Sequence, residues 1–205
     1  MGVPSTRPVS HIRHSLFFIL YFLFLPPSPA DAAPLRQRLQ KVERLIHQWR
    51  ELEAEKAMAP LITEHPRHNA VKVLHAEVLF RKGEYAAALA LLKEAARRDP
   101  SSLQVKAARD LVAATLATVK GHKAKYSPRK HFRIWTSPGK DEVLATFAGE
   151  TLEAIRDALR QDLGYAPPDT IRVEFYSRPE DLARVSGLTL KDIKTSGTIA
   201  LCKYN

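Results

Sequence analysis

An apolar residue at every third or fourth position is the dominant pattern in the first half of the chain. The first of these residues are Leu35, Leu39, Val42, Ile46 and Trp49. This spacing places the side chains on one face of an α-helix, where they can be buried together. The pattern continues to Val119 and predicts a series of helices. The expected helices run from 35 to 58 or 59 (before Pro60), 68–82, 84–98 and 101–119.

Two prolines mark a period in this helical region. Pro66 and Pro100 are 34 residues apart, which is the period of the tetratricopeptide repeat. The segment from Asn69 to Pro100 resembles that family in more than length, because turn-forming and small residues stand where two close helices need them. The candidate repeat signature consists of Gly83, Tyr85, Ala88, Ala95 and Pro100. The segment departs from the family pattern at Lys72 and His75, where bulky apolar residues are usual.

The resemblance implies tetratricopeptide-like helical hairpins over residues 34–119. Residues 35–66 would form a degenerate copy of the repeat. Each hairpin leaves one apolar face uncovered, which a neighbouring element or a bound partner must cover. We therefore expect the helical repeats to bind a protein or peptide partner. A plain helical bundle with a coincidental period is the alternative.

The pattern changes after residue 119. Residues 120–130 hold the densest basic cluster of a chain whose formal net charge is +10, and we expect a solvated basic linker there rather than a nucleic-acid site. Polar and apolar residues then alternate from His131 to Thr136, which predicts a strand. The remaining expected elements are a helix at 141–163 ended by Gly164, a strand at 170–176, short helices at 179–185 and 190–193, and a strand-like run at 197–202.

A strand, a long helix and a second strand form a β-α-β unit, whose strands are expected to be parallel. The side chains expected to face inward from the long helix are Val143, Leu144, Phe147, Ala148, Leu152, Ile155 and Leu159. The expected fold class is therefore α-helical tetratricopeptide-like hairpins followed by an incomplete α/β (α+β) domain with a β-α-β start. Three strands and one long helix make an incomplete layer, so we expect the chain to be an N-terminal fragment.

Residues 131–205 resemble the N-terminal part of the peptidase-MA-like domain of bacterial exported proteins. The residues that carry the resemblance are His131–Phe132, Pro138–Asp141, Asp162–Pro168, Asp181–Val185 and Thr195–Asn205. This family consists of gluzincin-type zinc metallohydrolases, often preceded by tetratricopeptide repeats. The resemblance implies a helix with the sequence H-E-x-x-H, in which two histidines bind Zn²⁺ and the glutamate activates the metal-bound water.

None of the eight histidines stands in an H-E-x-x-H sequence, so we assign no catalytic and no metal-binding residue in this chain. We expect no cofactor in this chain, and zinc only if a downstream H-E-x-x-H exists. The resemblance also implies an edge strand that pairs with an extended substrate. The candidate residues for this strand are Thr198, Ile199, Ala200, Leu201 and Cys202. A buried structural strand is the alternative, with Cys202 as a small apolar side chain.

The first 33 residues are typical of a signal peptide. Basic residues precede the apolar run Leu16–Leu25, which is too short to span a bilayer. Small residues follow, and cleavage is expected after Ala32 or Ala33. We therefore expect an exported protein, periplasmic or extracellular. An uncleaved segment that tethers the chain is the alternative, and it would be the only contact with a membrane.

Two functional hypotheses follow from these patterns. The first is an exported tetratricopeptide-containing protein that forms the N-terminal fragment of a zinc metallopeptidase or metallohydrolase, inactive on its own because its catalytic motif is absent. The second is a non-catalytic periplasmic protein-protein interaction module, which holds a peptide or an assembly partner in its repeat groove. Neither hypothesis involves nucleic acid.

Overall fold

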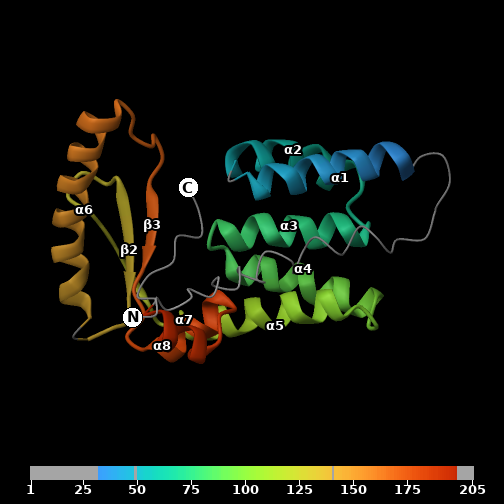
Figure 1. Cartoon of the computed structure of the whole chain (residues 1–205). Coiled ribbons are helices and arrows are strands. Elements are labelled where there is room, and N and C mark those ends of the chain that lie inside the picture. Colours follow the sequence, from blue (N-terminus) through green and yellow to red (C-terminus); the bar gives the residue numbers. More distant parts are fainter. Residues whose placement is uncertain (1–31, 49, 140, 198–205) are drawn as a thin grey trace, which may run out of the picture.

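The computed structural model describes residues 32–48, 50–139 and 141–197 (Figure 1). Five helices come first and form successive hairpins. Their bounds are α1 (Ala32–His47), α2 (Glu51–Glu64), α3 (Asn69–Arg81), α4 (Tyr85–Arg98) and α5 (Leu103–Thr118). A small three-stranded sheet with its own helices follows. Helical hairpins followed by a small α/β region are thus confirmed as the coarse architecture.

Helix α3 takes part in two apolar cores. The first core contains residues of α1, α2 and one side of α3. The second core contains residues of the other side of α3 and of α4 and α5. Because α3 packs on both sides, seven of its thirteen residues are buried. Lys72, which departs from the repeat pattern, lies on a flank of α3 and forms an ion pair with Glu94 of α4. The flank therefore accepts a charged residue where a bulky apolar one is usual.

The single helix expected from 35 to 58 or 59 is wrong, because the chain reverses after α1 and forms a second helix. Pro60, expected to follow a helix, lies inside α2. Proline removes a helical hydrogen bond and crowds the preceding turn, at a cost of about 3 kcal/mol. Ala54, Met58 and Leu61 of α2 are at most 1% exposed. Their burial against α1 and α3 outweighs that cost.

A mixed sheet with the strand order β1-β2-β3 follows the hairpins. Its strands are β1 (Lys123–Tyr126), β2 (Phe132–Thr136) and β3 (Ile171–Glu174). β1 is antiparallel to β2, β2 is parallel to β3, and α6 (Glu142–Leu163) connects the parallel pair. The β-α-β unit predicted from the sequence is confirmed, as is the end of its helix at Gly164.

Part of the predicted basic linker at 120–130 is a strand. All four side chains of β1 are exposed. The strand therefore lacks the alternation of apolar and polar residues that identifies a half-buried strand in a sequence. Its backbone pairing with β2, which continues with the Ser127 N–H donating to the Phe132 carbonyl at 2.9 Å, holds it in place.

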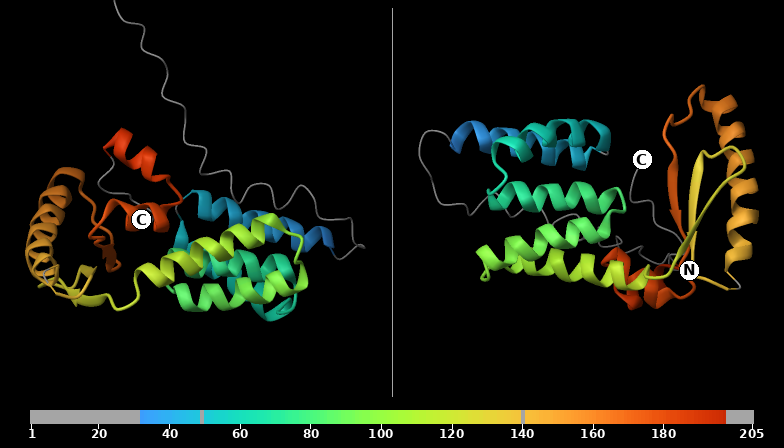
Figure 2. Two further views of the ribbon diagram at one scale, coloured as in Figure 1. Left: turned by 90° about the horizontal axis from the view of Figure 1, so that it is seen from below. Right: turned by 180° about the vertical axis from the view of Figure 1, so that it is seen from behind.

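The sheet lies between α6 on one side and the helical hairpins on the other (Figure 1). β3 is the strand nearest to the hairpins. α7 (Pro179–Ser186) packs against α5, and α8 (Leu190–Ser196) packs against α7. Figure 2 shows from two further sides that α6 lies at the end of the molecule away from α1 to α4.

Two sequence-based predictions fall mainly outside the described residues. Of the signal peptide expected at 1–33, only Ala32 and Ala33 are described, as the first residues of α1. Of the strand-like run expected at 197–202, only Gly197 is described, as the residue that follows α8, and the candidate edge-strand residues 198–202 lie wholly outside. Within the described ranges, no helix is both long enough and apolar enough to cross a membrane.

One carboxylate is buried in the second core. Glu77 of α3 is 6% exposed and lines a cavity of about 20 Å³ between α3, α4 and α5. Its Oε1 lies 3.5 Å from Arg81 Nη2. Burial raises the pKa of Glu77 to about 7, with a further rise from Glu43 of α1 and an opposing effect of Arg81. Folded Glu77 therefore holds its proton at pH values where the unfolded chain has lost it.

Replacing Glu77 with glutamine is expected to remove a pH dependence of stability. The folded-state pKa lies above the ordinary value of 4.5, so the free energy of unfolding of the wild-type chain falls as the pH rises from 4.5 to about 7. Glu77→Gln should lack this fall and should be more stable than the wild type above pH 7 by up to about 3 kcal/mol. Urea titrations on both sides of this window provide the measurement. Glu84→Gln, at an exposed position, should keep the wild-type slope, and a Glu77→Gln variant with that same slope would contradict the expectation.

Candidate protein-interaction surface

α6 contacts the sheet through its small side chains. Its buried residues are Ala145, Gly149 and Glu153, which stand four positions apart on one face. A Cβ atom at position 149 would lie 3.2 Å from the Ser127 Cα and 3.4 Å from the Ile134 Cδ1. Glycine at this position lets the helix approach the turn between β1 and β2 closely.

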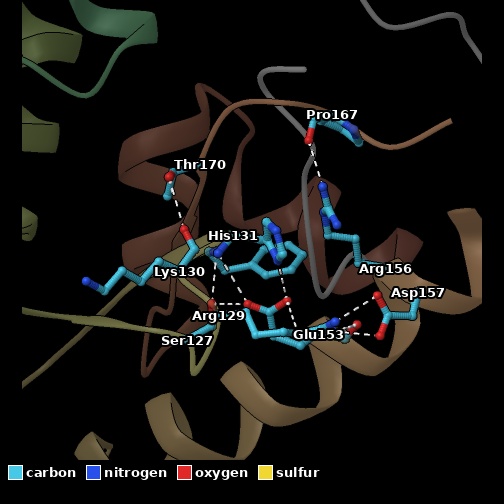
Figure 3. Close-up of polar contacts among 10 residues, drawn as sticks. Ser127, Arg129, Lys130, His131, Glu153, Arg156, Asp157, Pro167 and Thr170 are labelled. Atoms are coloured by element: carbon cyan, nitrogen blue, oxygen red, sulfur yellow. Dashed lines mark hydrogen bonds and ion pairs between the residues drawn. The ribbon is translucent and has the colours of Figure 1, made fainter.

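A buried carboxylate fixes this approach (Figure 3). Glu153 is 4% exposed, and its Oε1 accepts hydrogen bonds from the Ser127 hydroxyl at 2.5 Å and the His131 N–H at 3.2 Å. Its Oε2 lies 2.7 Å from His131 Nδ1 and 3.3 Å from Arg129 Nε. Arg129 also pairs with Asp157, one turn further along α6. We call these contacts of Glu153 the Glu153 anchor, because they bind the β1–β2 loop to the helix.

Glu153 is ionised in the folded chain. Burial disfavours its charged form, but the hydrogen bonds from Ser127 and His131 outweigh burial and lower the pKa of Glu153 to about 2. The Ser127 hydroxyl donates to Glu153 and accepts from the Phe132 N–H at 3.0 Å. A catalytic serine instead bonds to the histidine that takes its proton. The cluster thus has the residue types of a hydrolase triad with a different connectivity, which fits a structural role.

α6 carries an exposed apolar surface that turns around the helix axis along its length and continues just past the end of the helix. It consists of seven large side chains, each between 44 and 72% exposed. We call this surface the α6 band, and its members are Val143, Leu144, Phe147, Ile155, Leu159, Leu163 and Tyr165. Six of the seven lie on α6 itself, and they are the largest group of exposed large apolar side chains on one element among the described residues.

The inward-facing side predicted for α6 is wrong for most of its residues. Of the seven side chains expected to face inward, only Ala148 and Leu152 pack against the core of the sheet. The other five, Val143, Leu144, Phe147, Ile155 and Leu159, belong to the α6 band. Apolar residues occur on more than one side of α6. The close approach at Gly149 and the hydrogen bonds of Glu153 place the side with the smaller residues against the sheet.

Five members of the α6 band form a row at four-residue spacing together with Thr151. The row consists of Val143, Phe147, Thr151, Ile155, Leu159 and Leu163, and none of its members is charged. Such a row forms a ridge on the helix surface, inclined by about 26° to the axis. The band residues that lie within about 120° of one another around the axis are Val143, Leu144, Phe147 and Ile155, and they present on the order of 400 Å². The largest apolar patch of a typical monomer is about 300–600 Å².

The other face of the sheet meets the hairpins through an arginine between two aromatic rings. Arg172 Cζ lies 4.2 Å from the ring centroid of Trp135 and 5.5 Å from that of Tyr85. Arg172 Nε lies 2.6 Å from Glu174 Oε1, which also accepts the Tyr85 hydroxyl at 2.9 Å. A Cβ atom at Gly83 would lie 2.6 Å from Arg172 Cζ. These contacts join β3 to the α3–α4 turn and set the orientation of the sheet and of α6.

A second polar cluster lies at the carboxyl ends of β2 and β3. Ser137 Oγ lies 3.2 Å from His122 Nε2 and 3.2 Å from Ser177 Oγ, and Ser177 donates to Asp141. Burial lowers the pKa of His122, so its imidazole is neutral at pH 7. These groups bond to one another and join the strand ends. No motif marks this cluster or the Glu153 anchor in the sequence, because their members come from separate segments.

The structure places the candidate repeat signature at the α3–α4 hairpin. Gly83 lies in its turn, Tyr85 begins α4, and Pro100 follows the end of α4. Ala88 and Ala95 are 0% exposed, so α4 contacts its neighbours closely at both positions. Two of the five residues, Gly83 and Tyr85, also contact the sheet region through Arg172 and Glu174. The sequence does not indicate this second role.

Comparison of the chain with models of protein families, with curated proteins and with solved structures found no match. In the described part of the chain, no three His, Cys, Asp or Glu side chains are grouped so that they could hold a metal ion. The functional argument therefore rests on the geometry, in which the α6 band is the most prominent exposed feature.

Proposed function

We propose that this chain is an exported protein-interaction module whose partner-binding surface is the α6 band. The exposure of seven large apolar side chains along one helix and just past its end carries the proposal. Apolar patches of more than a few hundred Å² on soluble proteins mark interaction sites. Covering such a surface is favourable by about 25 cal/mol per Å². Export is inferred from the N-terminal segment, and the mass of the mature N-terminus tests that part.

The attachment of α6 supports a binding role. The Glu153 anchor and the close contact at Gly149 hold the inner side of the helix, so the outer side is presented in a fixed orientation. Rigid presentation lowers the entropy that a partner must overcome on binding. The helix also lies at the end of the molecule away from α1 to α4, where a partner can reach it (Figure 2).

Photo-crosslinking in the producing cells tests the proposal. Phe147, which is 69% exposed, is replaced by a photoreactive phenylalanine analogue, and Thr146, its exposed neighbour outside the band, is the matched control position. We expect a defined protein adduct from position 147 and little from position 146. Equal yields at the two positions, or no adduct at either, would contradict the proposal.

We propose, as a second function, that the region from residue 131 begins a peptidase-MA-like zinc metallohydrolase domain preceded by tetratricopeptide repeats. The order of elements supports this: helical hairpins come first, and the parallel pair β2 and β3 connected by α6 follows. The gene sequence beyond the codon for Asn205 provides the test. An in-frame H-E-x-x-H there supports this function, and a stop codon contradicts it. Zinc is the expected cofactor only in the first case.

A further inference from the structure

The carboxyl ends of the parallel strands β2 and β3 lie where α/β proteins commonly bind their ligands. β2 leads into α6, which covers one face of the sheet, and β3 leads toward α7, which packs against α5 on the side of the hairpins (Figure 1). In open α/β sheets, ligands bind at the carboxyl ends of neighbouring strands whose connections leave in opposite directions. The polar cluster of Ser137, Ser177, His122 and Asp141 lies at this position.

This cluster contains a serine in contact with a histidine. Ser137 directly follows β2, and His122 directly precedes β1, so the antiparallel register of the two strands brings them together. His122 Nε2 lies 3.2 Å from Ser137 Oγ. Ser177 donates its hydroxyl hydrogen to Asp141 and therefore offers Ser137 only an acceptor. The hydroxyl hydrogen of Ser137 thus has two acceptors within reach, His122 Nε2 and Ser177 Oγ.

We propose that Ser137 is a nucleophile and His122 its general base in the hydrolysis of carboxylic esters. This site is separate from the α6 band, and the inference does not depend on the proposed function. A hydroxyl within hydrogen-bond reach of an imidazole nitrogen has the connectivity that nucleophilic catalysis requires. Ser127, whose hydroxyl donates to the carboxylate of Glu153, does not have this connectivity.

The surroundings of His122 suit a general base. Burial lowers the pKa of His122, so the imidazole is neutral at pH 7 and can accept a proton. Glu174 of β3, Asp181 of α7 and Asp141 before α6 act in the opposite direction, and Arg172 adds to the lowering. The three carboxylates therefore stabilise the imidazolium that forms when His122 takes the proton of Ser137.

The reaction has two steps. In the first, Ser137 Oγ bonds to the ester carbonyl carbon while its proton passes to His122 Nε2, and the bond from that carbon to the alkoxy oxygen breaks as the alcohol takes the proton from Nε2. In the second, water attacks the acyl group and gives a proton to Nε2. Ser137 recovers this proton when the acyl–oxygen bond breaks. The products are an alcohol and a carboxylic acid.

The second nitrogen of His122 favours esters over peptides as substrates. Within the described ranges, the buried Nδ1 of His122 has no hydrogen-bond partner, whereas a catalytic triad places a carboxylate there. Disabling this carboxylate in a triad lowers turnover about 10⁴-fold. A serine and a histidine alone therefore suit the more reactive acyl donor, and an ester loses its alcohol more readily than a peptide loses its amine. Ser137 is half-buried, so a substrate can reach it.

Reaction of the purified chain with a fluorophosphonate tests the inference. Ser137 Oγ should bond to phosphorus as fluoride leaves, and mass spectrometry of peptides locates the label. We expect Ser137 to react about a hundredfold faster than Ser101, an exposed serine that donates to Asp99 instead of contacting a histidine. The rate at Ser137 should fall as the pH is lowered through the pKa of His122, below the ordinary 6.5, because the imidazolium cannot accept a proton.

Replacing the histidine separates base catalysis from simple accessibility. His122→Gln should lower the labelling rate of Ser137 about a hundredfold and remove its pH dependence. His65→Gln, in the loop before α3, is the matched control and should keep the wild-type rate. Circular dichroism checks the fold of both variants. Labelling of Ser137 no faster than of Ser101, or at an unchanged rate in folded His122→Gln, would overturn the inference. If His122→Gln does not fold, the rates and pH profile of the wild type decide.

Turnover of 4-nitrophenyl acetate tests the ester specifically. The wild-type chain should release 4-nitrophenol faster than the Ser137→Ala variant by about tenfold or more, and Ser101→Ala should match the wild type. Equal rates for the wild type and Ser137→Ala would show that Ser137 does not hydrolyse esters.

Discussion

Replacing Glu153 with alanine is expected to lower the free energy of unfolding by about 3–5 kcal/mol. The carboxylate is 4% exposed and accepts hydrogen bonds from the Ser127 hydroxyl and from the backbone of His131, with the His131 ring and Arg129 close to its second oxygen. Removing it leaves several buried donors without their acceptor and opens a cavity between α6 and the β1–β2 loop. The expected loss is therefore larger than that of an ordinary surface charge.

The pH dependence identifies the cause of this loss. The pKa of Glu153 falls from the ordinary 4.5 to about 2 in the folded chain. Its contribution to stability is therefore present above pH 4.5 and is lost as the pH falls toward 2, by about 3 kcal/mol in all. Glu153→Ala should lack this loss, which has the opposite direction to the effect of Glu77.

Urea unfolding at several pH values from about 2 to 7 provides the measurement. Glu150→Ala is the matched control, because Glu150 is an exposed carboxylate one turn earlier on the same helix. It should change the free energy of unfolding by less than about 0.5 kcal/mol. If Glu153→Ala matched Glu150→Ala in stability, or kept the wild-type loss in acid, the Glu153 anchor would not hold α6 in place.

α6 shows where sequence patterns stop being sufficient. The spacing of apolar residues predicts the helix and nearly its bounds, because burial at intervals of three and four is a local property. The same residues do not determine which side is buried. Two of the three buried positions are Gly149 and Glu153, which a hydrophobicity pattern assigns to solvent. Their roles depend on Ser127 and His131, which precede them by about twenty residues and are brought near by the fold.

Pro60 and β1 show the same limit in the secondary structure. Proline disfavours a helix by its local backbone preference. α2 nevertheless continues past Pro60, because the burial of Met58 and Leu61 stabilises the helical conformation there. β1 has no buried side chain, so its pairing with β2 leaves no apolar alternation in the sequence. By contrast, the hairpin turn at Gly83 and the end of α6 at Gly164 are local features, and the sequence predicts both.

Replacing Gly83 with alanine is expected to cost about 2–4 kcal/mol of unfolding free energy, for two separable reasons. Gly83 has a φ of +77°, where an alanine is strained by about 1–2 kcal/mol. The new Cβ would also lie 2.6 Å from Arg172 Cζ. The guanidinium would have to leave the Trp135 and Tyr85 rings, and each contact of this kind is worth about 0.5–2 kcal/mol.

A matched glycine separates strain from the displaced contacts. Gly121 has a φ of +86°, and a Cβ atom added there would meet nothing within 4 Å, so Gly121→Ala should show the strain alone. The second control is Gly83→Ala in a chain that already carries Arg172→Ala, where the clash is gone and the cost should fall to that of Gly121→Ala. The measurement is urea unfolding of the four variants and the wild type. If Gly83→Ala cost no more than Gly121→Ala, or cost the same with and without Arg172, then Arg172 would not connect the α3–α4 turn to β3. The hairpins would then not set the orientation in which α6 presents its apolar band.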